Sequence, residues 1–125
     1  MSVAACGEQS ASPPLVRLDV TMQGARAELR LVALGGARIN ARLKPTLERA
    51  DGGRIAFDAP GLTADSAYFS EPPVAHVAPW RDRLVGTLRV GVCAAGESFC
   101  RSLALPVSVV LRKRAARVEV AYSSR

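Results

Sequence analysis

Apolar and polar residues alternate with a period of two along most of this chain. Between residues 25 and 33, for example, Ala27, Leu29 and Leu31 fall on one side of an extended segment and charged residues fall on the other. Successive side chains of a β-strand point to opposite faces, so this pattern is typical of a strand with one face in the core. No segment sustains the 3.6-residue period of an amphipathic helix. We therefore expect the chain to fold from strands alone.

About eight or nine short strands are expected, because turn residues recur at the spacing of an antiparallel β-sandwich. The expected strands cover residues 15–22, 25–33, 38–43, 47–50, 54–59, 74–78, 83–92, 103–111 and 117–122. In the third of these, the alternation predicts that Ile39, Ala41 and Leu43 share one face. Residues 60–73 hold three prolines and predict a long loop. Loops of this length often carry function.

The 125 residues suffice for one domain with its own hydrophobic core. We expect residues 14–125 to form the sandwich. Residues 1–13 are small, polar and proline-containing, so we expect a disordered tether there.

The tether contains a short motif that predicts export. Val3-Ala4-Ala5-Cys6 resembles the end of a bacterial lipoprotein signal peptide, in which small residues precede a cysteine that is lipidated after cleavage. The chain holds three cysteines, and lipidation of Cys6 would leave one pair. This interpretation predicts a periplasmic protein, anchored to a membrane through Cys6. The alternative is a chance Ala-Ala-Cys in an alanine-rich chain.

The charge pattern argues against a nucleic-acid partner. The net charge is +6, but the arginines are scattered, and residues 112–114 form the one cluster. Nucleic-acid surfaces usually interleave basic clusters with exposed aromatic residues. The aromatic residues Tyr68, Phe69 and Trp80 do not lie among such clusters. No apolar run reaches the roughly 18 residues of a membrane-spanning helix, so membrane contact is expected only through the lipid anchor.

Two cysteines flank a predicted hairpin turn. If Gly96 and Glu97 are the central residues of a type II′ turn, which favours glycine at its first central position, Cys93 lies directly opposite Cys100. Opposed strand residues have Cα atoms roughly 4.5–5.5 Å apart, and a disulfide needs roughly 4.4–6.8 Å. A disulfide can therefore form there without backbone movement.

Other chemistry has little support in the sequence. The single histidine, His76, alternates with Val74 and Ala78, so we expect a partly buried, hydrogen-bonded side chain. With Cys93 and Cys100 it would give a soft metal three ligands and no fourth. No serine lies in a nucleophile elbow and no glycine-rich phosphate loop is present. We expect no metal and no other cofactor, and the cysteine pair remains the candidate site.

The pair has two interpretations. As a structural cross-link it closes a loop of about eight residues, which the chain-entropy model values at roughly 2.5 kcal/mol. As a reactive pair it sits beside small residues that leave room for a partner. No neighbour in sequence stabilises a thiolate: Arg101 points to the opposite face, and Glu97 would raise a thiol pKa. A reactive pair would therefore be the passive side of an exchange, attacked by a partner with an activated thiol.

The segment from residue 65 to residue 107 resembles the N-terminal periplasmic domain of the thiol:disulfide interchange protein DsbD. The matching features are the polar-aromatic run 65–69, the run 80–84, the alternating strand 86–92, and the cysteines at 93 and 100 with Phe99 before the second. The resemblance implies an immunoglobulin-like sandwich whose cysteines lie on adjacent strands.

The resemblance also implies a function. It makes Cys93 and Cys100 a redox-active pair that exchanges electrons with a thioredoxin-fold or membrane thiol:disulfide protein. It implies that an aromatic residue of the preceding loop shields the pair, with Phe69 preferred over Tyr68. The alternative is a non-catalytic immunoglobulin-like binding or assembly module of a lipoprotein, in which the disulfide is structural.

Overall fold

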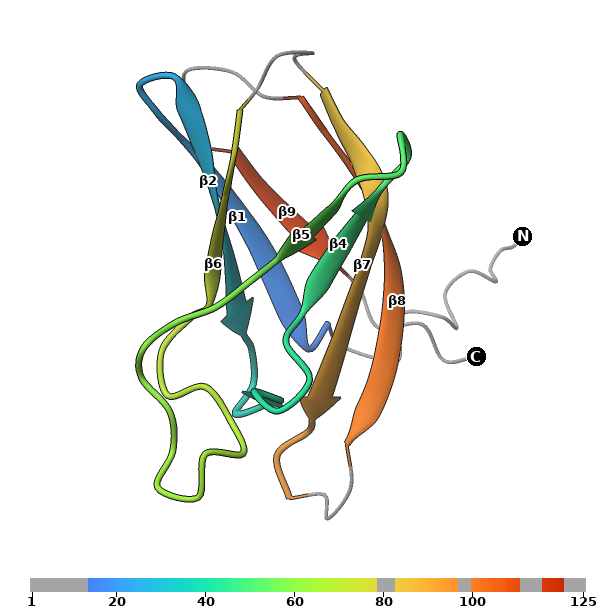
Figure 1. Ribbon diagram of the computed structural model, residues 1–125. Helices are drawn as coiled ribbons and strands as arrows, with labels where there is room; N and C mark the ends of the chain where they lie inside the picture. Colours follow the sequence, from blue (N-terminus) through green and yellow to red (C-terminus); the bar gives the residue numbers. More distant parts are fainter. Residues whose placement is uncertain (1–13, 79–82, 97–99, 111–115, 121–125) are drawn as a thin grey trace, which may run out of the picture.

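The computed structural model describes residues 14–78, 83–96, 100–110 and 116–120, and within them the chain forms nine strands and no helix. Figure 1 shows their arrangement. The strands are β1 (Val16–Gln23), β2 (Arg26–Ala33), β3 (Arg38–Ile39), β4 (Thr46–Arg49), β5 (Arg54–Ala56), β6 (Val74–Val77), β7 (Arg83–Cys93), β8 (Arg101–Val110) and β9 (Ala116–Val120). The prediction of an all-β chain is confirmed.

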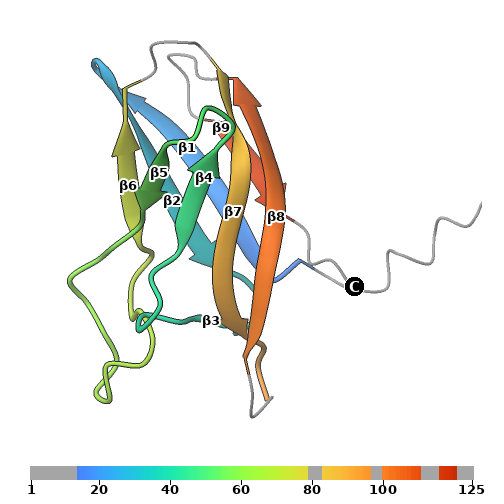
Figure 2. The same cartoon turned by 45° about the vertical axis from the view of Figure 1, so that its right-hand side comes forward.

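The strands form two antiparallel sheets that face each other (Figures 1 and 2). One sheet has the order β6-β2-β1-β9. In the other sheet, β7 is the central strand. One edge of β7 pairs with β8, and its other edge pairs with β3 and β4. Strand β5 pairs with the far edge of β4. The groups β1-β2-β6 and β8-β7-β4-β5 follow the strand order of immunoglobulin-like sandwiches. The predicted sandwich is therefore confirmed.

The core lies between the sheets and is built from alternate residues of the long strands. Val16, Leu18 and Val20 of β1 are fully or almost fully buried, and so are Leu29 and Leu31 of β2. The second sheet and its connections contribute Leu47, Phe57, Leu84, Leu88, Val92, Leu105 and Val107. The period-two pattern of the sequence thus identifies the buried face of β2 correctly.

The predicted strand over residues 38–43 ends early. The side-chain oxygen of Asn40 accepts hydrogen bonds from the backbone N–H groups of Arg42, at 2.7 Å, and Leu43, at 3.1 Å. This side chain turns the chain away from β7, so β3 stops at Ile39. Leu43 is 76% exposed. The expectation that Leu43 shares the core face with Ile39 is wrong.

The environment of His76 also differs from the prediction. In β6 the residues that face the core are Ala75 and Val77, and His76 lies on the exposed face. Its Nε2 atom is 3.9 Å from the carboxylate of Glu28 on β2. The expected face of Val74, His76 and Ala78 is therefore one residue away from the buried face of β6. Val74, the first residue of the strand, is partly exposed.

Several predicted features lie outside the described residues. They are the tether 1–13 with the proposed lipidation site Cys6, the aromatic residues Trp80 and Phe99, and the basic cluster 112–114. Across the described part of the chain, no helix is long and apolar enough to cross a membrane.

Candidate redox site

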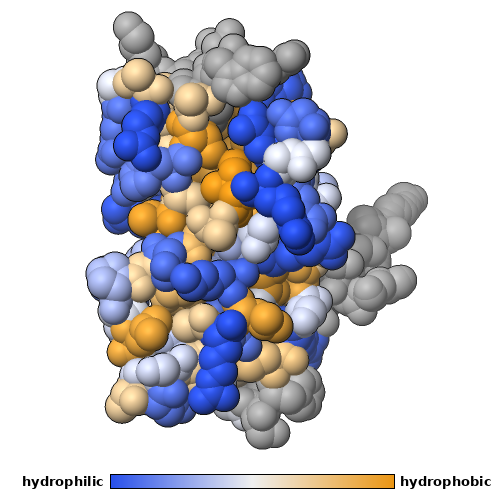
Figure 3. Space-filling model, viewed as in Figure 1, coloured by the Kyte–Doolittle hydropathy of each residue, from blue (hydrophilic) through white to orange (hydrophobic). Residues whose placement is uncertain are grey.

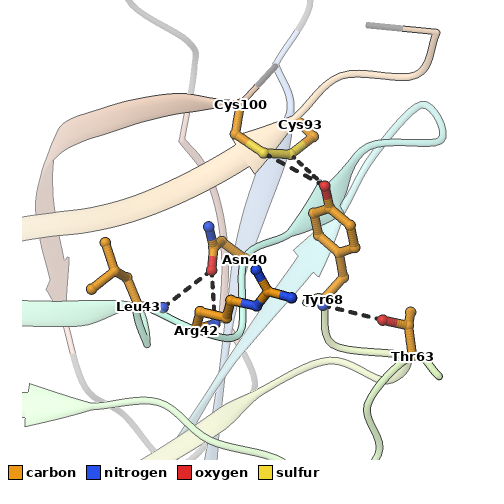
Figure 4. Close-up of a disulfide and its surroundings, with 7 residues drawn as sticks. All are labelled: Asn40, Arg42, Leu43, Thr63, Tyr68, Cys93 and Cys100. Atoms are coloured by element: carbon orange, nitrogen blue, oxygen red, sulfur yellow. Dashed lines mark hydrogen bonds between the residues drawn. A yellow bond between two sulfur atoms is a disulfide. The ribbon is translucent and has the colours of Figure 1, made fainter. Parts of the chain in front are cut away.

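The β7–β8 hairpin brings the two cysteines together. Ten residue pairs run from Arg83 opposite Val110 to Val92 opposite Arg101. The next pair in this register is Cys93 and Cys100, which form a disulfide with their Cα atoms 4.0 Å apart. Gly96 follows with a φ of +80°, as the first central residue of a type II′ turn requires. The predicted pairing of the cysteines is confirmed (Figure 4).

The two halves of the disulfide differ in exposure. Cys93, the last residue of β7, is 1% exposed. It lies between β8 on one side and β3 on the other, opposite Arg38. Cys100 precedes β8 and is exposed. Among the described residues, the disulfide is therefore exposed on the side of Cys100 and buried on the side of Cys93.

The hydroxyl of Tyr68 lies against the disulfide (Figure 4). Its oxygen is 3.4 Å from the sulfur of Cys93 and 3.9 Å from the sulfur of Cys100. A disulfide sulfur carries no proton, so the hydroxyl is the donor and the sulfurs are the acceptors. The nearer contact is with the buried sulfur.

The aromatic residue at the disulfide is thus Tyr68, whereas the sequence analysis preferred Phe69. Phe69 is 9% exposed and packs in the hydrophobic core. Neighbouring residues of an extended segment point to opposite sides, so only one of the two can face the sulfurs. Of the two candidates for shielding, Tyr68 has its polar end on the disulfide, whereas the apolar ring of Phe69 is buried in the core.

Backbone hydrogen bonds hold Tyr68 in place. The N–H of Ala41 donates to the carbonyl of Ala67 at 2.9 Å, and the N–H of Phe69 donates to the carbonyl of Ile39 at 3.0 Å. Residues 67–69 therefore lie alongside the end of β3 as a short antiparallel segment. The predicted loop 60–73 contains no strand, and it begins earlier than expected because β5 ends at Ala56 and not at residue 59. The part of the loop that carries Tyr68 is attached to the sheet.

A compact turn precedes Tyr68. The carboxylate of Asp65 accepts hydrogen bonds from the hydroxyl of Thr63, at 2.8 Å, and from the N–H of Ala67, at 3.1 Å. These bonds, the one from Thr63 first, lower the pKa of Asp65 below its usual value. Thr63 in turn accepts from the N–H of Tyr68 through its hydroxyl oxygen, at 3.2 Å. Ser66 completes the turn with a φ of +60°. Asp65 and Thr63 thus fix the position from which Tyr68 reaches the sulfurs.

Arg38 joins the site from β3. Its guanidinium carbon lies 4.2 Å from the centre of the Tyr68 ring, a cation–π contact that holds the ring against the hairpin. Arg38 is not among the residues predicted to lie at the site. The pairing of β3 with β7 links residues 38–39 with 92–93, and no local pattern in the sequence indicates so distant a contact.

This arrangement supplies what a thiol–disulfide exchange needs on its passive side. Attack at one sulfur expels the other as a thiolate, and the exchange is faster when that leaving thiolate is stabilised. Cys100 is the exposed cysteine of the pair. Attack there would expel Cys93, beside a hydroxyl that can donate to the developing negative charge. The sequence showed no such stabilising group because Tyr68 is distant along the chain.

Comparison with protein-family models, with curated protein sequences and with solved structures finds no match to this chain. In the segments that the structure describes, no three histidine, cysteine, aspartate or glutamate side chains gather as metal ligands would.

Proposed function

We propose that this protein is a thiol–disulfide exchange module that passes electrons through the Cys93–Cys100 pair. The partner is a protein with an activated thiol, of the thioredoxin fold or a membrane thiol:disulfide protein. One observation carries the proposal: the disulfide presents Cys100 at the surface and keeps Cys93 buried next to the hydroxyl of Tyr68.

The exchange proceeds in two displacements. A partner thiolate attacks the sulfur of Cys100, so that a mixed disulfide forms and the Cys93–Cys100 bond breaks. The bonding electron pair leaves with Cys93 as a thiolate, which takes up a proton from solvent. A second thiolate of the partner then attacks the partner's first sulfur, which is bonded to Cys100, and expels Cys100 as a thiolate that takes up a proton. The module gains two electrons and two protons, and the partner is left with a disulfide. The reverse sequence oxidises the module.

The reduction potential of the pair tests the proposal. Structural disulfides typically have potentials below about −300 mV, which makes them resistant to reduction by the glutathione pool. We expect a value above this limit, measured by equilibration with dithiothreitol or glutathione and quantified by mass spectrometry. A value well below about −300 mV would contradict the proposal.

A second function is supported by the burial of Cys93, which is 1% exposed. In this alternative the chain is a non-catalytic immunoglobulin-like binding or assembly module, and the disulfide only stabilises the hairpin. The double variant Cys93→Ala/Cys100→Ala would then bind its partner normally and melt at a lower temperature. Loss of the partner at unchanged stability would exclude this alternative.

The proposed location follows from the same chemistry. Disulfides persist mainly in oxidising compartments such as the bacterial periplasm. We propose that the protein is exported there and anchored through a lipid on Cys6. Labelling of cells with a palmitate analogue tests the anchor: the native chain should be labelled and Cys6→Ser should not.

A further inference from the structure

A groove of about 370 Å³ begins at Cys100 and runs over the outer face of the β3–β4 loop and strands β4, β5, β7 and β8. Four of the side chains that line it carry positive charge: Lys44, Arg54, Arg89 and Arg101. Among the described residues that line it, none carries negative charge. The exposed residue Cys100 therefore lies at one end of a basic groove.

Two carboxylates lie next to three of these cations. Glu48 accepts from Arg89 at 3.0 Å and from Arg54 at 3.1 Å, and Asp58 accepts from Lys44 at 2.9 Å. These bonds lower the pKa of both carboxyl groups, Glu48 chiefly through Arg89 and Asp58 chiefly through Lys44. Glu48 is shared by Arg54 and Arg89, so the two carboxylates leave one excess positive charge among Lys44, Arg54 and Arg89. The side chains of Lys44, Arg54 and Arg89 are all more than half exposed and face solvent.

The groove also has an apolar edge. Leu43 lines it and is 76% exposed, held out by the two hydrogen bonds that Asn40 accepts from the backbone. Figure 3 shows hydrophilic side chains crossing this side of the molecule between smaller apolar areas. A fixed apolar side chain among cations is a contact surface for a chain segment that combines apolar and acidic residues.

We propose that the groove docks an acidic segment of the exchange partner, one that carries carboxylates beside the thiol that attacks Cys100. This inference rests on the proposed function, because it names the partner of the same disulfide. The cations guide the segment into the groove and bring its thiolate to Cys100. They also offset the negative charge that the thiolate brings to the site.

Two synthetic cysteine peptides test the proposal: Asp-Gly-Cys-Gly-Asp and its basic counterpart Lys-Gly-Cys-Gly-Lys. Each reduces the intact protein, and release of the Cys93 thiol is followed by alkylation and mass spectrometry. Each rate is divided by the rate of the same peptide with hydroxyethyl disulfide, an uncharged reference, because the flanking charges change the reactivity of the peptide thiol itself. We expect the corrected rate to be about fivefold higher for the acidic peptide at low salt, and the preference to shrink in 0.5 M salt.

Matched variants connect the preference to the groove. Arg54→Gln/Arg89→Gln removes two charges from the groove and should abolish most of the preference. Arg26→Gln/Arg30→Gln removes two exposed charges from β2, in the other sheet, and should leave the preference unchanged. In each pair at least one arginine contacts a carboxylate, Glu48 in the groove and Glu28 on β2.

The outcomes separate this inference from the proposed function. If both peptides form mixed disulfides with Cys100 at equal corrected rates, or if both double variants lose the preference alike, the groove has no docking role and the exchange function stands. If neither peptide nor dithiothreitol opens the disulfide of the folded protein, the proposed function and this inference both fail.

Discussion

The molecule contains two long hairpins, and they differ in how they are held together. The β1–β2 hairpin is joined by eight residue pairs and turns at Gly24, whose φ is +62°. The β7–β8 hairpin is joined by ten pairs and turns near Gly96, whose φ is +80°. Only the second carries a disulfide next to its turn. The β1–β2 hairpin therefore keeps its register in this fold without a cross-link.

The surroundings of the two turns differ as well. Residues 23–26 at the β1–β2 turn are all exposed. The cysteines of the β7–β8 hairpin instead meet Tyr68 from the long loop and Arg38 from β3. The two turns lie at opposite ends of the sandwich (Figure 1). Side chains from three distant parts of the sequence thus gather around the disulfide, which favours a reactive role for it.

The largest loss of stability is expected from a core substitution in the β1–β2 hairpin, which has no disulfide. Leu29 of β2 is fully buried, so Leu29→Ala should lower the free energy of unfolding by about 3 kcal/mol through the lost transfer energy and the cavity left behind. Urea denaturation measures this loss. The rate at which dithiothreitol reduces the folded variant should match that of the native protein. A loss of less than about 1 kcal/mol would mean that packing does not hold this hairpin.

Removal of the disulfide should lower the free energy of unfolding by a smaller amount. The chain-entropy model gives at most about 2.5 kcal/mol for a loop of this size, so Cys93→Ala/Cys100→Ala should be destabilised less than Leu29→Ala. Amide exchange should still show protection at Val90 and Leu103, which are paired in the hairpin. Loss of that protection would show that the disulfide is needed to form the hairpin and would support the structural alternative.

The Tyr68→Phe variant separates shielding from chemistry. The ring stays over the disulfide and only the hydroxyl is lost, so the stability should change by less than about 1 kcal/mol. Reduction by dithiothreitol should slow by about fivefold, because the departing Cys93 thiolate loses its hydrogen-bond donor. An unchanged rate would limit Tyr68 to a shielding role.

The smallest effect is expected on the loss of stability at acidic pH. The pKa of Asp65 is lowered in the folded state by its bonds to Thr63 and Ala67, so its carboxylate stabilises the fold above its usual pKa of about 4. That contribution is lost as the pH falls through the lowered pKa. Thermal unfolding at about pH 6 and about pH 3 should therefore show a smaller acid-induced loss for Asp65→Asn than for the native protein. Equal losses would mean that this turn does not depend on the carboxylate.

The sequence predicts much of the fold because its main signals are local. Alternation in residues 25–33 identifies the buried face of β2, and Gly96 fixes the register that places Cys93 opposite Cys100. The prediction was wrong where a side chain overrides the pattern, as at Asn40, which ends β3 and exposes Leu43.

The environment of the disulfide is harder to predict. Tyr68 and Phe69 are adjacent aromatic residues, and which of them faces the sulfurs depends on how residues 67–69 pair with the end of β3. Arg38 reaches the site through the pairing of β3 with β7. Both contacts join segments that are far apart in the chain, and a single sequence carries no signal for them.

The central claim is that Cys100 is attacked and Cys93 leaves. It is tested most directly by reacting the native, oxidised protein with a thioredoxin-fold reductant that lacks its second active-site cysteine, so that the mixed disulfide accumulates. Peptide mass spectrometry then identifies the linked cysteine. The account predicts a covalent complex through Cys100, with Cys93 as a free thiol. A complex through Cys93, or no complex with the folded protein, would contradict it.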